Sequence, residues 1–476
     1  FQFGILVLLQ WGATELSAQS PSIDTVLLQF KSDIPFAGIG LPQKVLQDAL
    51  GRPFCYVASK EGGLRIYGVA DIEHPALEKV FLIADLSGQE VMNLWQQGHL
   101  LYLALGNFFG GTNPPGLAII DLTDPENAFV TDVWISAAAG RGCAFVTVSG
   151  DYAYLGAMSQ GLIILRISDS EHIEFVSQYI PDIHFPVQNP NSIQLPNARG
   201  MEVRADTVWL CYDAGGLRII NVSDKLQPAE INRYINPGAL GKQQAYNNIV
   251  LSGNTAYIAV DFCGLEILDI SETENISEVA WWNPWDCQSP GNTWINSPGH
   301  SNQIELNAEK RLVFLSTGRS ELNILDVSQA DQPQQIGTYG SPADNYFTWG
   351  ASIHEDRVYL SYISSLFPFF SIWAGVRMLE WDAVTGTTGT TEPFIDRLYP
   401  NPFQESFFLD LDIKKQGLLK IDILDIHGKL VAEWINVEVI AGEQTFWWHG
   451  ELPPGCYFIR MTTGSGSVVR KVVFGV

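Results

Sequence analysis

The sequence predicts an all-β fold: a seven-bladed β-propeller followed by a small C-terminal β-sandwich of the immunoglobulin-like type. Three observations predict it. One nine-residue phrase recurs seven times, each copy lies among short strand-like runs, and a different strand pattern starts after residue 393. The composition agrees, with 12% aromatic and 17% charged residues, 43 Gly and 25 Pro. Many short strands joined by tight turns give this profile.

The recurring phrase starts with Gly in six of its seven copies and continues as an apolar strand. The copies are GLRIYGVAD at Gly63, GLAIIDLTD at Gly116, GLIILRISD at Gly161, GLRIINVSD at Gly216, GLEILDISE at Gly264, ELNILDVSQ at Glu321 and GVRMLEWDA at Gly375. The last two are weaker. The period is about 50 residues, which suits a propeller blade of four strands.

Each copy is interpreted as the third strand, C, of a blade. In the fourth unit, strand A is MEVRA (201–205), strand B is DTVWLCYD (206–213) and strand D is EINRYI (230–235). Seven units predict seven blades; six blades and an embellishment are the alternative. After the copy at Gly375 no strand D follows. Because an open ring exposes strand edges, we expect the preceding orphan strand 24–31 to become the outer strand of blade 7.

The two ends of the chain have patterns of their own. An apolar run followed by small residues predicts the end of a signal peptide over 1–18, with a buried first strand as the alternative. We expect the propeller over 19–384, a Thr/Gly linker over 385–393 and a second domain over 394–476. No later stretch reaches the ~18 apolar residues that a membrane helix needs, so no transmembrane segment is expected.

The phrase GLRIINVSD, preceded by VWLCYDAG and followed by a Pro and a strand with a Tyr near its end, resembles the LVIVD repeat of bacterial surface proteins. The resemblance implies a propeller on the cell surface and gives little guidance on chemistry. The weaker copies depart from it, since Glu321 replaces the Gly and EWD stands where DVSD is expected in the last copy. These departures put the blade borders in question more than the fold.

Four motifs follow in order near the C-terminus: YPNPF (399–403), DIHGK (425–429), LPPGCY (452–457) and a basic, apolar final strand. Together they resemble the type A sorting domain of type IX secretion, over residues 395–476. The resemblance implies a Bacteroidetes-type host, contact with the secretion machinery, and removal of the tail with attachment to surface polysaccharide. An unrelated accessory sandwich is the alternative.

Charge and motifs exclude several classes of function. The net charge of −25 disfavours nucleic acid as a partner, whereas cations, sugars and protein surfaces remain open. No HExxH, GxSxG or Walker pattern appears, and no CxxC pair suggests zinc. We therefore expect no cofactor and no metal. Asp residues recur near strand ends, where they are expected to cap turns rather than bind calcium: Asp121, Asp124, Asp169, Asp224, Asp269 and Asp326.

The long loops predict which face binds a ligand. In an up-and-down blade, A–B and C–D turns lie on one face, and B–C and D–A connections on the other. The long insertions are all of the second kind: 106–116, 181–200, 283–300 and 363–375. Long loops on a rigid scaffold commonly carry binding sites. Cys263 and Cys287 both fall on this face, so we expect them to form a disulfide.

Two sets of candidate ligand-binding residues follow from this geometry. Side chains on the loop face suit sugar rings or a protein hot spot, or alternatively pack inside their own loops: Phe109, His184, Trp285, Trp294 and Trp373. Side chains at the starts of the A strands should surround the mouth of the central channel: Arg141, Arg199, Asn247, Asn248, His300, Asn302 and Trp349. An Arg pair there could receive a carboxylate. A water-filled channel with polar caps is the alternative.

We therefore expect a secreted protein attached to the outer cell surface, which serves as a binding or adhesion module for glycan or protein. A polysaccharide hydrolase or lyase is one alternative, with the mouth Arg and His residues and a nearby carboxylate as its site. A structural component of the surface layer is another. Asp213 and Asp261 end strand B in neighbouring blades and are interpreted as residues of the repeat, not as an acid/base pair.

Overall fold

The structure is a computed structural model of the 476-residue chain. It describes these residues: 23–36, 40–107, 112–187, 195–239, 241–242, 245–364, 371–385, 394–413, 416–426, 428–450, 452–463 and 466–475. The predicted signal peptide and almost all of the predicted linker lie outside the described residues. No helix among the described residues is long and apolar enough to span a membrane.

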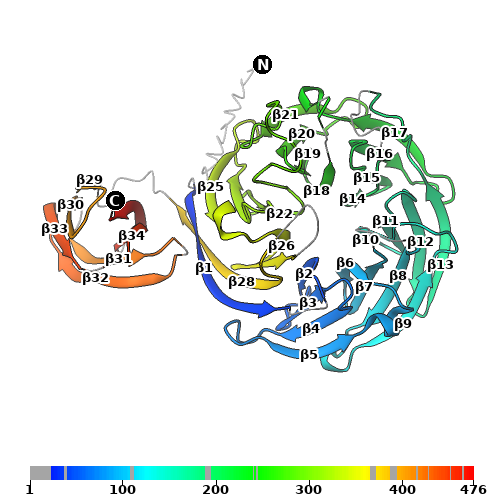
Figure 1. Cartoon of the computed structure of the whole chain (residues 1–476), viewed down its shortest axis with the longest axis horizontal. Helices are drawn as coiled ribbons and strands as arrows, with labels where there is room; N and C mark the ends of the chain where they lie inside the picture. The colour runs from blue at the N-terminus through cyan, green and yellow to red at the C-terminus, as the bar shows by residue number, and fades with distance from the viewer. Residues whose placement is uncertain are drawn as a thin grey trace, which may run out of the picture. The chain divides into compact units, whose positions relative to one another are not determined.

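Seven four-stranded antiparallel sheets, arranged as blades around a central axis, make up the larger unit (Figure 1). Blades 1 to 3 are β2 (Lys44–Gln47), β3 (Phe54–Ala58), β4 (Leu64–Gly68), β5 (Ala76–Phe81); β6 (Val91–Gln97), β7 (Leu100–Leu105), β8 (Gly116–Asp121), β9 (Phe129–Ile135); and β10 (Phe145–Ser149), β11 (Tyr152–Gly156), β12 (Leu162–Asp169), β13 (His172–Tyr179). Blades 4 to 6 are β14 (Met201–Arg204), β15 (Thr207–Cys211), β16 (Leu217–Asn221), β17 (Ala229–Tyr234); β18 (Tyr246–Ser252), β19 (Thr255–Val260), β20 (Gly264–Asp269), β21 (Ser277–Trp282); and β22 (Ile304–Asn307), β23 (Leu312–Ser316), β24 (Leu322–Asp326), β25 (Gln334–Tyr339). Blade 7 is β26 (Thr348–His354), β27 (Arg357–Tyr362), β28 (Gly375–Thr385) and β1 (Ile23–Pro35). Short 3-10 turns are η1 (Ile83–Leu86), η2 (Pro125–Asn127), η3 (Pro237–Ala239) and η4 (Pro342–Asp344).

The burial of each strand follows its place in the blade. Strands B and C pack between neighbouring blades, so they are apolar on both faces; β16 is buried over its first four residues. Strand D is the outer strand, and β17 alternates between exposed and partly buried residues. The inner strands contact one another in an unbroken ring from β2 through β26 and back to β2.

The N-terminal strand closes the ring. In blade 7 the strand order is β1-β28-β27-β26, so β1 lies outermost, beside the strand C that ends the propeller. Arg377 on β28 binds Asp33 on β1 through two hydrogen bonds, of 2.8 and 2.9 Å. Lys31 on β1 forms a further ion pair with Glu380 on β28, at 2.6 Å. Side chains as well as the sheet therefore hold the two ends of the propeller together.

The B–C turns link each blade to the next. The backbone N–H of the first residue of β18, Tyr246, donates to the carbonyl of Asp213 in the B–C turn of blade 4, at 3.1 Å. The same bridge recurs between other neighbouring blades: Lys60 with Val91, Met158 with Ala198, Asp261 with Ser301 and Gly318 with Thr348. These backbone bridges fix the starts of the A strands, where the channel opens on the loop-rich face.

The glycine that starts the repeat is required by geometry in blade 4. Gly216 has φ +76°, and a Cβ atom there would lie 2.3 Å from the carbonyl oxygen of Tyr234 on strand D. Gly63, Gly161 and Gly264 show the same positive φ and the same approach to strand D. Any side chain at such a position meets both backbone strain and a clash.

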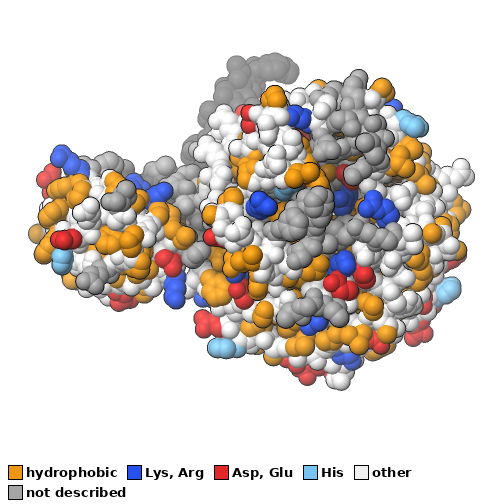
Figure 2. Space-filling view, viewed as in Figure 1, with side chains coloured by type: hydrophobic (Ala, Val, Ile, Leu, Met, Phe, Trp, Pro, Cys, Tyr) orange, Lys and Arg blue, Asp and Glu red, His pale blue; other side chains and the backbone are white. Residues whose placement is uncertain are grey.

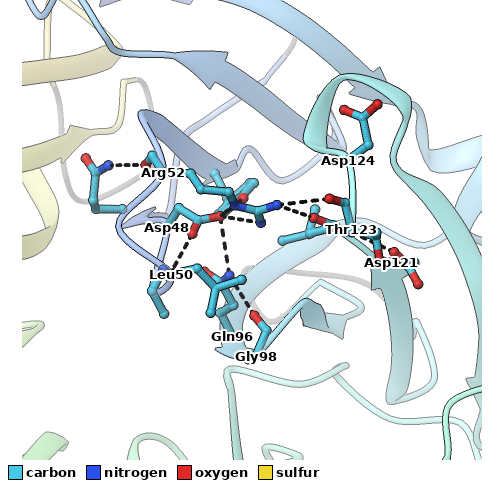
Figure 3. Close-up of polar contacts among 12 residues, drawn as sticks. Asp48, Leu50, Arg52, Gln96, Gly98, Asp121, Thr123 and Asp124 are labelled. Atoms are coloured by element: carbon cyan, nitrogen blue, oxygen red, sulfur yellow. Dashed lines mark hydrogen bonds and ion pairs between the residues drawn. The ribbon is translucent and has the colours of Figure 1, made fainter.

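The opposite face carries short turns held by polar contacts (Figure 3). In blade 1, Arg52 forms an ion pair with Asp48 at 2.7 Å and donates to the backbone carbonyls of Leu122 and Thr123 in blade 2. Tyr56 also donates to Asp48. Burial alone would raise the pKa of Asp48, but hydrogen bonds from Arg52 and Tyr56 outweigh it, and the pKa is lowered. This network ties two blades together by their turns.

The smaller unit is a two-sheet sandwich. One sheet has the order β29-β30-β33 and the other β32-β31-β34-β35. The strands are β29 (Phe394–Tyr399), β30 (Ser406–Ile413), β31 (Gly417–Leu424), β32 (Leu430–Val439), β33 (Gly442–His449), β34 (Gly455–Thr463) and β35 (Gly466–Phe474). Phe407, Ile421 and Ile459 are fully buried between the sheets. This unit has its own core, as expected for a separate domain.

Candidate ligand-binding site at the channel mouth

A polar pocket lies on the propeller axis, where the A strands begin. The space amounts to about 340 Å³ when the open solvent above it is included. Its lining comes from six blades: Asn93, Ala144, Phe145, Arg199, Gly200, Asn247, Asn248, Asn302, Gln303 and Trp349. Figure 2 shows one face of the molecule, on which Lys and Arg side chains lie around the centre of the ring.

The pocket includes most of the side chains that the sequence places at the mouth. Arg199, Asn248 and Trp349 line it, together with Asn247 and Asn302. The two other predicted mouth residues do not line the pocket. Arg141 is exposed. His300 is 3% exposed and lies beneath the surface.

A neighbouring carboxylate explains the burial of His300. Its Nδ1 lies 2.5 Å from Oδ1 of Asp261, and the indole N–H of Trp294 donates to the other oxygen of that carboxylate at 2.8 Å. The imidazole also packs between the rings of Trp294 and Phe347. These contacts hold His300 within the wall of the propeller.

Arg199 is held at the mouth by a second carboxylate. Its Nε lies 3.8 Å from Oδ2 of Asp213, which also accepts a hydrogen bond of 3.2 Å from Asn197. Burial raises the pKa of Asp213, since the charged form is disfavoured away from water. Asp213 therefore neutralises Arg199 only to the extent that it is ionised at the pH of the experiment.

Irregular A strands supply several of the pocket residues. The ladders of β6, β18 and β26 each skip one residue near the mouth, namely Met92, Asn247 and Trp349. Such β-bulges turn side chains away from the regular alternation and are frequent beside binding sites. Gly200 makes room for the neighbouring Asn248, because a Cβ there would lie 2.6 Å from Oδ1 of Asn248.

The candidate Trp residues of the loop face pack against other side chains of the propeller. Trp285 meets Trp282 edge to face, at 5.7 Å between ring centroids. Trp373 packs against Tyr362 at 5.1 Å and against the guanidinium of Arg377. Trp294 is engaged by Asp261, as described above. All three indoles are partly buried.

The other loop-face candidates differ in what can be said of them. His184 is exposed. Phe109 lies outside the described residues. Cys263 and Cys287 form a disulfide with a Cα–Cα distance of 5.2 Å, and it joins the B–C turn of blade 5 to the 283–300 loop. This bond holds the loop that carries Trp285 and Trp294 against the blade.

The recurring Asp residues cap turns. Each accepts a hydrogen bond from the backbone N–H two residues further on, as in Asp224 with Leu226 at 2.9 Å; the others are Asp121, Asp124, Asp169, Asp269 and Asp326. No group of three or more His, Cys, Asp or Glu within the described ranges is placed to hold a metal ion.

Sequence reasoning missed Asn93 and Gln303, two of the buried amides in the pocket. Neither belongs to the recurring phrase, and each lies on an A strand or immediately before one. An available signal was a polar residue within an otherwise apolar inner strand, as in VMNLW (91–95). A single strand does not reveal this signal. The polar position is recognised as recurrent only when the seven A strands are aligned with one another.

Family models match both parts of the chain. The LVIVD repeat matches residues 140–180 and 245–281. The secretion system C-terminal sorting domain matches residues 397–475. The chain thus carries LVIVD repeats and a type IX sorting domain, as the motifs predicted. No curated protein sequence matches the chain.

Solved structures confirm the fold. The β-propeller domain of Cps50 (Swd1) from Myceliophteria thermophila is similar with a TM-score of 0.50 and 10% identity, over 74% of this chain and 99% of that one. Raptor from Chaetomium thermophilum is similar with a TM-score of 0.54 and 9% identity, over 76% of this chain and 29% of that one. At these identities the likeness shows the propeller fold alone.

Proposed function

We propose that this secreted LVIVD-repeat propeller is a binding module of the cell surface, which holds a glycan or a protein at the mouth of its channel. One observation carries the proposal: side chains from six blades converge on a single pocket on the loop-rich face. A rigid ring keeps those side chains in place without a ligand, and preformed sites of this kind favour binding. The sorting domain supports a surface location and contact with the secretion machinery.

The test fills the pocket. Ala144→Trp places an indole among the lining residues, whereas Asp151→Trp places the same side chain on an exposed A–B turn of the opposite face. We expect the full chain to bind a glycan array or labelled cells, and Ala144→Trp to lower that binding at least tenfold. Asp151→Trp should bind like the parent.

Other outcomes would contradict the proposal. If the parent chain binds neither glycans nor cell surfaces, the protein is not a binding module. If both Trp variants bind as well as the parent, the ligand does not occupy the channel mouth. Release of reducing ends from a polysaccharide would instead favour a hydrolase.

A further inference from the structure

Resting on the proposed function, we infer that the channel mouth takes an uncharged sugar residue, the end of a neutral glycan. Three buried amides whose hydrogen-bonding groups are not fully used within the protein carry this inference: Asn93, Asn248 and Gln303. They are 3, 6 and 6% exposed, and all three line the pocket. They come from blades 2, 5 and 6, so they face the same space from different sides.

Asn93 is the clearest of the three. Among the described residues no side-chain or backbone group hydrogen-bonds to its amide. An amide offers two N–H donors and a carbonyl with two lone pairs, and leaving such a group unpaired in a buried position is unfavourable. The Asn93 side chain therefore requires partners from the pocket itself, either water or a ligand.

The other two amides are anchored by one atom and free at the other. Asn248 accepts from the backbone N–H of Ile249 through Oδ1, at 2.8 Å, which leaves its N–H groups for the pocket. Gln303 donates through Nε2 to the carbonyl of Gln43 at 3.3 Å, and its Oε1 is buried without a partner among the described residues. The pocket thus offers donors from Asn248 and both donors and an acceptor from Asn93, with Gln303 behind them.

This mixture of donors and acceptors selects the chemistry of the ligand. A carboxylate or phosphate only accepts and an ammonium group only donates, so either would leave part of the amide set unpaired. A hydroxyl group does both, and adjacent hydroxyls of a sugar ring match the paired N–H and C=O of an amide. The rings of Phe145 and Trp349 supply apolar wall against which the C–H face of a sugar can pack.

Charge and size narrow the class further. Arg199 is the only ionic side chain that lines the pocket in the described part of the chain, and Asp213 lies 3.8 Å from it. The chain carries a net charge of −25, which repels polyanionic glycans. The pocket is small and partly open to solvent, which suits the end of a chain rather than its middle. Because six blades surround the pocket, a polysaccharide can enter it only by the end of its chain.

The test uses the full chain and six methyl glycosides as probes: those of glucose, galactose, mannose, N-acetylglucosamine, glucuronate and galacturonate. Binding is measured by saturation-transfer NMR and titration. We expect at least one neutral glycoside to bind at least tenfold more tightly than either uronate. Asn93→Leu should weaken that binding at least tenfold, because no protein partner replaces the lost sugar contact.

A matched substitution separates binding from folding. Asn275→Leu changes an exposed Asn in a C–D turn of the opposite face and should leave binding unchanged. The melting temperature of Asn93→Leu should equal or exceed that of the parent, since the substitution removes a buried amide without a protein partner. Binding that survives Asn93→Leu would overturn the assignment of the site, although the propeller would remain a binding module.

Two results would overturn the ligand class. Tighter binding of a uronate would show that Arg199 dominates the pocket and that the ligand is anionic. Failure of all four neutral glycosides would overturn the inference outright. The proposed function would then stand only if the chain still binds cells or the glycan array through the channel mouth, which the Ala144→Trp variant reports independently.

Discussion

Where blade 4 meets blade 5 and where blade 6 meets blade 7, the third residue of the recurring phrase is an acid in one case and a base in the other; we call these two contacts corners. In blade 5 this position is Glu266, which is fully buried. Its carboxylate accepts hydrogen bonds from Tyr246 at 2.6 Å and from Tyr234 of blade 4 at 3.0 Å. In blade 7 the position is Arg377, which is paired with Asp33. Blades 5 and 7 therefore both hold an ionisable side chain at this position, one acidic and one basic.

The residue at the start of the recurring phrase in the preceding blade also differs between the two corners. Blade 4 keeps the glycine of the repeat, Gly216, next to the corner that holds Glu266. Blade 6 has Glu321 instead, whose Oε2 lies 3.9 Å from Arg377 and accepts a hydrogen bond from Tyr362. In blade 6, therefore, a carboxylate replaces the glycine, and a cation, Arg377, lies beside it in blade 7.

The two corners also differ in which of two neighbouring positions is a glycine. In blade 4 the residue after strand D is Ile235, and a Cβ on Gly216 would approach it to 3.1 Å. In blade 6 the residue after strand D is Gly340, and a Cβ there would lie 2.0 Å from Cδ of Glu321. The space is filled by Ile235, which follows strand D, in blade 4. In blade 6 it is filled by Glu321, which precedes strand C. A departure from the repeat is therefore matched by a second one about 20 residues away.

The largest effect is expected from giving blade 7 the charge of blade 5. Arg377→Glu would place a carboxylate beside Asp33 and Glu321 and remove an ion pair that holds β1. Removing one partner of a buried pair typically costs about 3–5 kcal/mol. This pair is partly buried, but the new carboxylate also adds repulsion, so we expect a loss of about 4 kcal/mol in urea unfolding. The control Arg166→Glu breaks an exposed pair with Glu174 and should cost less than about 1 kcal/mol. Equal losses would show that the corner has no special role.

A smaller effect is expected from a methyl group at the glycine of blade 4. Gly216→Ala meets the carbonyl of Tyr234 as well as an unfavourable φ, so we expect a loss of about 3 kcal/mol in the free energy of unfolding. Gly253→Ala is the control, because φ is also positive there and nothing lies within 4 Å of the added Cβ. It should cost about 1 kcal/mol. A similar cost at both positions would refute the close approach.

The exchange between Glu321 and Gly340 predicts a coupling. Gly340→Ala should destabilise the parent by about 1–3 kcal/mol, since its methyl group meets the Glu321 side chain. In a Glu321→Gly background the same change should cost at least about 1 kcal/mol less. A double-mutant cycle in urea measures the difference, and additive effects would show that the two positions are independent.

The two corners should share one dependence on pH, because each contains a carboxyl whose pKa is raised by burial. Burial raises the pKa of Glu266 to about 7 and that of Glu321 to about 7, from 4.5. Folding then favours the neutral carboxyl, so this stabilisation is complete below pH 4.5 and is lost as pH rises to about 7. Glu266→Gln or Glu321→Gln should flatten the fall in melting temperature across that window by a few degrees. The exposed control Glu274→Gln should leave the curve unchanged.

Sequence reasoning predicted the fold well because the fold is periodic. The phrase anchored at Gly63, Gly161, Gly216 and Gly264 marks strand C by a backbone requirement that only glycine meets easily, and that requirement is visible in one sequence. The missing strand D after Gly375 and the orphan strand at 24–31 made blade 7 predictable in the same way.

The candidate site was predicted in part, because its residues come from strands without a shared phrase. Arg199 and Asn248 could be found from their place at the start of A strands. Asn93 could not, since the β-bulge that directs it is a property of the ladder and not of the local sequence. His300 was expected at the mouth, yet Asp261 of the neighbouring blade holds it inside the wall, and a partner 39 residues away leaves no local signal.

The pairing of β1 with β28 has a consequence for the order in which the blades fold. These strands are separated by almost the entire propeller sequence, and contacts between distant segments form late because the intervening chain must first be brought together. We therefore expect blade 7 to be completed last, and until then its edge is open to other strands. Once it has formed, the polypeptide enters and leaves the ring at one blade. Proteolysis after Thr385 would then release the tail and leave the closed ring intact.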